Sequence, residues 1–163
     1  MCGFCGFITK NNNFDNKVII KEINNLQKHR GPDSEGYYIN SDLNLYLAHR
    51  RLSVLDLSNN GNQPMFDNSK KKVIIFNGEI YNHLQLRKKY FDNQYWKSQS
   101  DTETLLNLII KIGPENTLKV LEGMFSFAYF DLTKNIFYLA RDRFGEKPLY
   151  YGWSENTFLF SSE

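Results

Sequence analysis

Cysteine is scarce in this 163-residue chain, and the two copies stand close together at Cys2 and Cys5. Two thiols so near each other cannot staple a domain, and a reducing compartment keeps such thiols unpaired. They do not form a metal site either, because the chain offers no second ligand pair and its three histidines are dispersed. We therefore expect no metal in this chain, and each thiol is left as a nucleophile or a core residue.

Long apolar runs and a strong net charge are also missing. No segment approaches the ~18 apolar residues of a membrane span, and the first residues lack the pattern of a secretory signal. The formal net charge of +2 is too small to indicate nucleic acid or an anionic membrane as partner. The composition, 41% hydrophobic and 15% aromatic, is that of a globular protein. We expect a cytoplasmic protein with no nucleic-acid or membrane partner.

Strand patterns dominate both ends of the sequence, and helical patterns fill the middle. A buried strand is expected over residues 2–9 and an amphipathic helix over 16–29. Strands without a strand–helix alternation favour the α+β class over a doubly wound sheet. Further helices are expected over 82–90, 101–112 and from Pro114, and further strands at 37–39, 43–57, from 71 to near 77, and at 123–131, 135–142, 149–153 and 157–162.

Cys2 directly follows the initiator methionine. Once Met1 is removed, the thiol shares its residue with a free α-amine, whose ordinary pKa of ~7.7–8.0 suits it to accept the thiol proton near neutral pH. An amine base beside a side-chain nucleophile is the N-terminal version of the serine–histidine pair. The alternative is a chance cysteine before a buried strand. Cys5 has no free amine and is interpreted as a small core residue.

The dipeptide Asn77-Gly78 stands where a strand is expected to end. An asparagine side-chain N–H and a glycine backbone N–H can point at one oxygen, as an oxyanion hole requires. Asn-Gly is also the commonest dipeptide of a tight hairpin turn. The residues that follow are apolar and then helical rather than an alternating return strand, which favours a site at the strand end.

Two neighbouring arginines, Arg50 and Arg51, lie among apolar residues. Arginine in a buried strand favours a planar anion such as a carboxylate. An ion pair within the chain is an equal alternative, with Asp33, Asp56 or Glu79. Asp101 stands at the start of the helix expected over 101–112, where Asp101 or Thr102 as the N-cap is the simplest interpretation.

The order of these motifs resembles a known family. The stretches that carry the resemblance are MCG, HRGPD, AHRRLSVLDLS, QPM, NGEIYNH, SDTE, LEGMFSFAYFD and RDRFGEKPLYY. They resemble the class II glutamine amidotransferase domain of glutamine-hydrolysing asparagine synthetase, from Met1 to the final FSSE. Related sugar-phosphate and purine-pathway amidotransferases share the leading cysteine but differ at HRGPD and NGEIYN. The resemblance implies one domain over 1–163, a four-layer α/β/β/α sandwich of the N-terminal nucleophile hydrolase type.

The resemblance also implies roles for the matching residues. Cys2 would be the nucleophile that attacks the side-chain amide of L-glutamine, and Asn77 with Gly78 would form the oxyanion hole. Arg51 would clamp the α-carboxylate of the substrate. Main-chain groups of four consecutive residues would line the pocket, namely Leu52, Ser53, Val54 and Leu55.

The substrate α-ammonium would lie between Glu79 and Asp101, an arrangement that fits free glutamine rather than glutamine in a peptide. Arg50 matches no site residue of the family and is expected to face elsewhere. His49 and Asp33 match the family pattern and are expected to support the site.

In the family a second, C-terminal domain binds ATP and Mg²⁺, adenylates aspartate and receives the ammonia. Its Ser-Gly-Gly pyrophosphate loop does not occur in this sequence. We therefore expect no cofactor in this chain, and expect ATP and Mg²⁺ only in a C-terminal or separate synthetase domain. The chain would be a fragment, an excised domain or a truncated product. Two alternatives stay open: a related enzyme that amidates another acceptor, and a non-catalytic glutamine-binding module.

Overall fold

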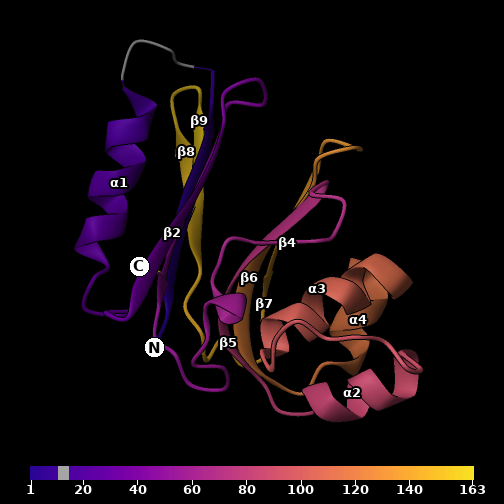
Figure 1. Ribbon diagram of the computed structural model, residues 1–163. Coiled ribbons are helices and arrows are strands. Elements are labelled where there is room, and N and C mark those ends of the chain that lie inside the picture. The colour runs from indigo at the N-terminus through magenta and orange to yellow at the C-terminus, as the bar shows by residue number, and fades with distance from the viewer. Residues whose placement is uncertain (11–14) are drawn as a thin grey trace.

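A computed structural model of the chain describes residues 1–10 and 15–163. Two antiparallel sheets lie face to face (Figure 1). Helix α1 (Asn16–Leu26) covers the outer side of one sheet. Helices α2 (His83–Tyr90), α3 (Asp101–Ile112) and α4 (Pro114–Val120) lie on the outer side of the other. The layers therefore follow the order α/β/β/α, and the expected α+β class and four-layer sandwich are confirmed.

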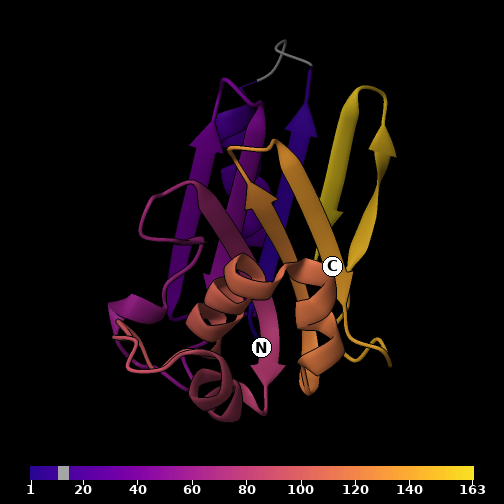
Figure 2. The same ribbon diagram turned by 90° about the vertical axis from the view of Figure 1, so that its right-hand side faces the viewer.

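Both sheets are antiparallel throughout. The first has the strand order β2-β3-β1-β9-β8 and the second β4-β5-β6-β7. The first sheet contains β1 (Gly3–Thr9), β2 (Ser34–Asn40), β3 (Leu45–Arg51), β8 (Tyr150–Ser154) and β9 (Thr157–Ser161). The second contains β4 (Met65–Phe66), β5 (Lys72–Ile80), β6 (Gly123–Asp131) and β7 (Ile136–Arg141), and a 3₁₀ turn spans Asn59–Gly61. The N-terminus lies near the lower end of the sheets in both views (Figures 1 and 2).

Most expected elements are present, but β2 is longer than the strand expected at 37–39, β4 was not expected, and three further differences concern α1, β3 and β5. Helix α1 ends at Leu26, short of the expected residue 29, because the backbone N–H of Gln27 turns back to cap it. The strand expected over 43–57 stops at Arg51 and gives way to a loop. Strand β5 runs past Asn77 to Ile80, so neither the expected strand end nor the hairpin turn is present there. The pairing of β5 with β6 carries the strand through the Asn-Gly dipeptide.

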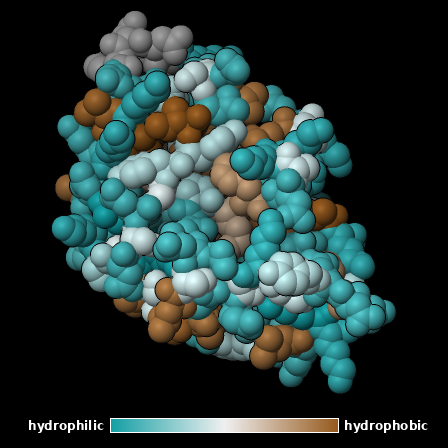
Figure 3. All heavy atoms as spheres, in the orientation of Figure 1, coloured by the Kyte–Doolittle hydropathy of each residue, from teal (hydrophilic) through white to brown (hydrophobic). Residues whose placement is uncertain are grey.

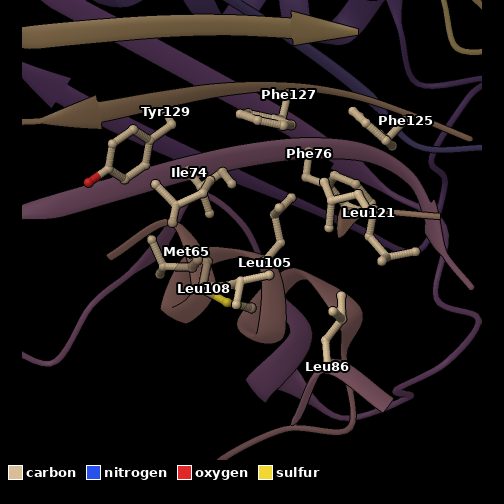
Figure 4. Packing of buried hydrophobic residues seen from close by; sticks show 13 residues of the cluster. Met65, Ile74, Phe76, Leu86, Leu105, Leu108, Leu121, Phe125, Phe127 and Tyr129 are labelled. Atoms are coloured by element: carbon tan, nitrogen blue, oxygen red, sulfur yellow. The ribbon is translucent and has the colours of Figure 1, made fainter. Parts of the chain in front are cut away.

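The second sheet packs against its helices through a continuous apolar cluster. Figure 4 shows Ile74 and Phe76 of β5 pointing toward Leu105 and Leu108 of α3. The prediction of a helix over 101–112 is confirmed, and its apolar side chains are those that contact the sheet. This packing holds the start of α3 against the end of β5, where Asp101 and Glu79 are found.

The sheets pack on each other through a second cluster, and α1 packs on the first sheet through a third. Phe4 of β1 and Ile75 of β5 are fully buried between the sheets, whereas Cys5 of β1 packs toward Ile20 of α1. The surface in Figure 3 is largely hydrophilic, with hydrophobic residues in separate patches. Within residues 1–10 and 15–163, no helix has the length and apolar character needed to cross a membrane.

Replacement of Cys5 by alanine is expected to destabilise the fold. The Cys5 side chain is 2% exposed and lies in the cluster under α1. Its removal leaves a small cavity, and we expect the free energy of unfolding to fall by about 1 kcal/mol. Urea denaturation measures this change, with Cys2→Ala, at a partly exposed position before β1, as the matched variant. Equal losses in the two variants would show that Cys5 is not a packing residue.

Candidate active site

Residues of three strands converge between the sheets near the N-terminus. Side chains alternate along a strand, so Cys2 shares the inward direction of Phe4, and Asn77 shares that of Ile75. Arg51 is the last residue of β3, and by the same alternation it shares the inward direction of Leu47. The same alternation explains why the neighbouring residues Cys5 and Arg50 point to the opposite face.

A pocket of about 160 Å³ opens at this place. Of the ten residues predicted from the sequence, Ser53 alone is not in its lining. The other nine line it: Cys2, Arg51, Leu52, Val54, Leu55, Asn77, Gly78, Glu79 and Asp101. The Ser53 backbone N–H instead donates to Oδ2 of Asp33 at 2.7 Å. Asp33 thereby holds the loop after β3, which is the supporting position expected of it.

The Cys2 thiol contacts the main chain of Leu52. The Leu52 N–H donates to Sγ at 3.3 Å, and Sγ lies 3.6 Å from the Leu52 carbonyl oxygen. Burial raises the pKa of the Cys2 thiol, whereas the Leu52 N–H and the positive charge of Arg51 lower it. Because burial is the larger effect, the thiol needs a base to become a nucleophile.

Arg30 is a site residue that sequence reasoning missed. Its Nε donates to the Cys2 carbonyl oxygen at 3.0 Å. In the amide orientation that gives both atoms a partner, Asn77 donates to the same oxygen at 3.0 Å and accepts from Nη2 of Arg30 at 3.2 Å. The HRGPD motif contains Arg30 and is the sequence signal that could have indicated it. Arg30 and Asn77 together hold the main chain of Cys2.

Gly78 lies where a side chain has no room. A Cβ atom at this position would be 2.2 Å from the carbonyl oxygen of Met124 and 2.6 Å from Cα of Phe125. Phe125 is the residue of β6 that pairs with Gly78. Glycine is therefore required for β5 and β6 to approach each other beside the pocket.

Arg51 is held by main-chain and amide oxygens of the loop that follows it. Nη1 donates to the Ser58 carbonyl at 2.7 Å and to Oδ1 of Asn62 at 2.9 Å, and Nη2 donates to the Asp56 carbonyl. Among the described residues no carboxylate forms an ion pair with Arg51. For Arg51 the alternative of an ion pair with Asp33, Asp56 or Glu79 is therefore wrong, and its charge in the pocket has no direct counter-ion.

Arg50 faces the other way, as expected. Its Nη2 forms an ion pair with Oε2 of Glu35 at 2.7 Å, a carboxylate outside the three expected, and its Nε donates to the Asn24 carbonyl at 3.0 Å. It therefore ties α1 to the outer face of the first sheet. His49 is fully buried, and its Nε2 lies 3.0 Å from the Phe76 carbonyl oxygen across the two sheets. Burial lowers the pKa of His49 to about 4, so the ring is neutral and has a supporting position.

Asp101 does not cap α3, and neither does Thr102. Ser100 is the N-cap, with its side chain accepting from the Thr102 N–H at 3.1 Å. Asp101 instead accepts from the Ile80 N–H at 2.8 Å through Oδ2. Burial raises the pKa of Asp101 to about 6, and the nearby Glu79 charge adds to the effect. Two carboxylates on one wall of a pocket favour a cationic ligand group.

The described residues, 1–10 and 15–163, contain no group of three or more histidine, cysteine, aspartate or glutamate side chains placed to hold a metal ion.

The layers, and a residue-2 thiol in a pocket between the sheets, are those of the N-terminal nucleophile hydrolase type of fold. A family model of the glutamine amidotransferase domain matches residues 1–163, and the chain belongs to this family. The family resemblance of the sequence motifs is thus confirmed.

Similar proteins are much longer than this chain. Asparagine synthetase B (glutamine-hydrolyzing) of Escherichia coli is 40% identical over 161 residues, which cover 98% of this chain and 28% of that protein. Asparagine synthetase (glutamine-hydrolyzing) 1 of Bacillus subtilis is 40% identical over 167 residues, covering 100% and 26% respectively. The chain therefore spans about a quarter to a third of the length of the curated relatives it matches.

Asp101 should make stability depend on pH. Its folded-state pKa of about 6 lies above the ordinary value of 3.8, so the protonated form favours folding. This contribution is complete below about pH 4 and is lost as the pH rises through about 6. Asp101→Asn removes the titration but keeps an oxygen for the Ile80 N–H. We expect its free energy of unfolding, relative to the parent chain, to rise by about 2–3 kcal/mol between about pH 4 and pH 7.

Urea denaturation at the two pH values measures this difference. A pH-independent difference between Asp101→Asn and the parent chain would contradict the buried-charge assignment.

Proposed function

We propose that this chain hydrolyses the side-chain amide of free L-glutamine to glutamate and ammonia, with Cys2 as the nucleophile. One observation carries the proposal: a thiol, an arginine without a counter-ion and a pair of carboxylates line one pocket. These groups complement the electrophilic amide, the α-carboxylate and the α-ammonium of a free amino acid. Membership of the glutamine amidotransferase domain family supports the same substrate.

The charged side chains of the pocket divide between the two charged groups on the α-carbon of the substrate. Arg51 would bind the α-carboxylate, with the main chain of the loop from Leu52 to Leu55 around it. Glu79 and Asp101 would hold the α-ammonium. A glutamine within a peptide has no α-ammonium to offer to these carboxylates, so the arrangement selects the free amino acid.

Removal of Met1 precedes the reaction and frees the α-amine of Cys2. The amine takes the thiol proton, which is necessary because burial raises the pKa of the thiol. The thiolate attacks the amide carbon of glutamine, and the side-chain N–H of Asn77 and the backbone N–H of Gly78 stabilise the oxyanion. Ammonia leaves with a proton from the Cys2 ammonium. Water then hydrolyses the thioester and releases glutamate.

The ammonia would serve an ATP-dependent synthetase domain, either C-terminal to this one or separate, that amidates aspartate. The names of the relatives and the share of their length that this chain covers support this part of the proposal. ATP and Mg²⁺ would bind to that domain, whereas residues 1–163 would form the glutaminase domain. A cytoplasmic location belongs to the same proposal.

Glutamate release from L-glutamine tests the proposed function. The chain with a free Cys2 amine should release glutamate, and Cys2→Ala should abolish the release while thermal stability changes little. A non-cleavable N-terminal tag should also abolish it, because the amine becomes an amide that cannot accept a proton, whereas the same tag at the C-terminus should not. Equal activity of the two tagged proteins would contradict the amine-base mechanism.

Substrate binding and transition-state stabilisation should separate between two variants. Arg51→Ala should raise KM strongly, because loss of such a charged contact costs ~2–5 kcal/mol. Asn77→Ala should mainly lower kcat, by ~10²–10³, because an oxyanion-hole donor binds the developing charge most tightly. Initial rates across a glutamine series measure both, after circular dichroism has shown that each variant is folded. If Arg51→Ala lowered only kcat, or Asn77→Ala only raised KM, the proposed orientation of glutamine would be wrong.

A further inference from the structure

One buried lysine lies in the pocket without a role in the mechanism above. Lys147 is 5% exposed and lines the pocket with Cys2, Asn77 and Gly78. Its Nζ lies 3.1 Å from Sδ of Met1. Within the part of the chain that the structure describes, no carboxylate forms an ion pair with Lys147. A thioether is only a weak acceptor, so the ammonium has no direct counter-charge.

Hydrogen bonds hold the loop that carries Lys147. It crosses from β7 of one sheet to β8 of the other at residues 142–149. The Asp142 side chain accepts from the Lys147 N–H at 3.0 Å, and Nε of Arg141 donates to the Lys147 carbonyl at 2.8 Å. Both hydrogen-bonding groups of the Lys147 main chain are thereby fixed, which limits where its side chain can lie.

The same loop is attached to the strand beside Asn77 and Gly78. Asp142 also accepts from the Phe125 N–H at 3.2 Å, and the Ser126 hydroxyl donates to the Pro148 carbonyl at 3.1 Å. Phe125 and Ser126 of β6 are the residues that pair with Gly78 and Asn77 of β5. Lys147 is therefore positioned from the strand that also positions the proposed oxyanion hole.

The lining of the pocket carries more acidic than basic side chains. Three carboxylates line it, whereas Arg51 and Lys147 are the two cationic side chains in the described lining. Arg51 is assigned to the substrate carboxylate, and Arg30 donates to the Cys2 carbonyl. A thiolate at Cys2 would be opposed by these three acidic groups: Asp56, Glu79 and Asp101.

A buried ammonium without a partner is unfavourable unless an anion forms beside it. The proposed reaction forms the Cys2 thiolate, the tetrahedral oxyanions and finally the γ-carboxylate of glutamate, and all of these anions form at the Cys2 end of the pocket. Lys147 lines the pocket together with Cys2, and its ammonium contacts the side chain of Met1, the residue bonded to Cys2. Removal of Met1 takes that contact away and leaves the ammonium in a pocket that Cys2 also lines.

We propose that Lys147 is a further functional residue of this site, whose ammonium stabilises negative charge at Cys2 and on the oxyanion. This inference rests on the proposed glutaminase function. Lys147 would act at the reacting sulfur, whereas Arg51 would bind the carboxylate of the substrate in addition to the effect of its charge on Cys2.

Two measurements on Lys147→Met, made after removal of Met1, test this inference. The first is the pH dependence of Cys2 alkylation by iodoacetamide, followed by the mass of the N-terminal peptide. Loss of the positive charge should move the alkylation midpoint upward by about one pH unit. The second is glutamate release, where kcat should fall at least about tenfold while KM changes by less than about threefold.

Two further variants provide controls. Lys147→Arg keeps the charge and should restore the alkylation midpoint and most of kcat. Lys134→Met removes a lysine from the exposed turn between β6 and β7 and should behave as the parent chain. Lys147→Gln repeats the test if the methionine variant does not fold.

An unchanged alkylation profile in a folded Lys147→Met protein would overturn the inference. A rise in KM alone would also overturn it, because Lys147 would then bind the substrate rather than the reacting sulfur. If the parent chain released no glutamate but the alkylation midpoint still moved in Lys147→Met, the glutaminase proposal would fail while the coupling of Lys147 to Cys2 would stand.

Discussion

The face-to-face packing of two antiparallel sheets is the constraint on which the rest of this structure depends. Alternation along each strand sends every second side chain into the space between the sheets. Apolar side chains fill most of that space, and toward one side of it the same inward positions are occupied by Cys2, Arg51 and Asn77. The neutral His49 ring, hydrogen-bonded to the Phe76 carbonyl, ties the two sheets together beside these residues. The pocket is thus the polar end of the inter-sheet core.

The pocket holds charges that the fold alone would not favour. Asp101 is buried beside Glu79, and Arg51 and Lys147 lie in the pocket without direct counter-ions among the described residues. Uncompensated buried charge lowers stability, and such groups gather where a ligand or a reaction supplies the missing partner. The proposed ligand, a zwitterionic amino acid, would supply an ammonium and a carboxylate together and so complement both signs of charge.

Much of this arrangement could be predicted from local patterns. Alternation along the strands places Cys2 and Cys5 on opposite faces, and likewise Arg51 and Arg50. The helix predicted over 101–112 from its apolar spacing is present in the structure. The features that the sequence predicted wrongly or not at all depend on contacts between segments that are far apart in the sequence. Pairing with β6 carries β5 through Asn77-Gly78, and the Ile80 N–H draws Asp101 away from capping. Arg30 and Lys147 reach the Cys2 end only through the fold, and no spacing in the sequence indicates that.

The central claim is that the inter-sheet pocket binds free L-glutamine with its amide at Cys2. Covalent labelling with an L-glutamine analogue that carries a chloromethyl ketone in place of the side-chain amide tests it most directly. Peptide mass analysis should find one adduct, on Cys2 and not on Cys5, and excess L-glutamine should prevent it while glutamine blocked at its α-amine should not. Labelling of Cys5, or equal protection by the blocked glutamine, would contradict the account.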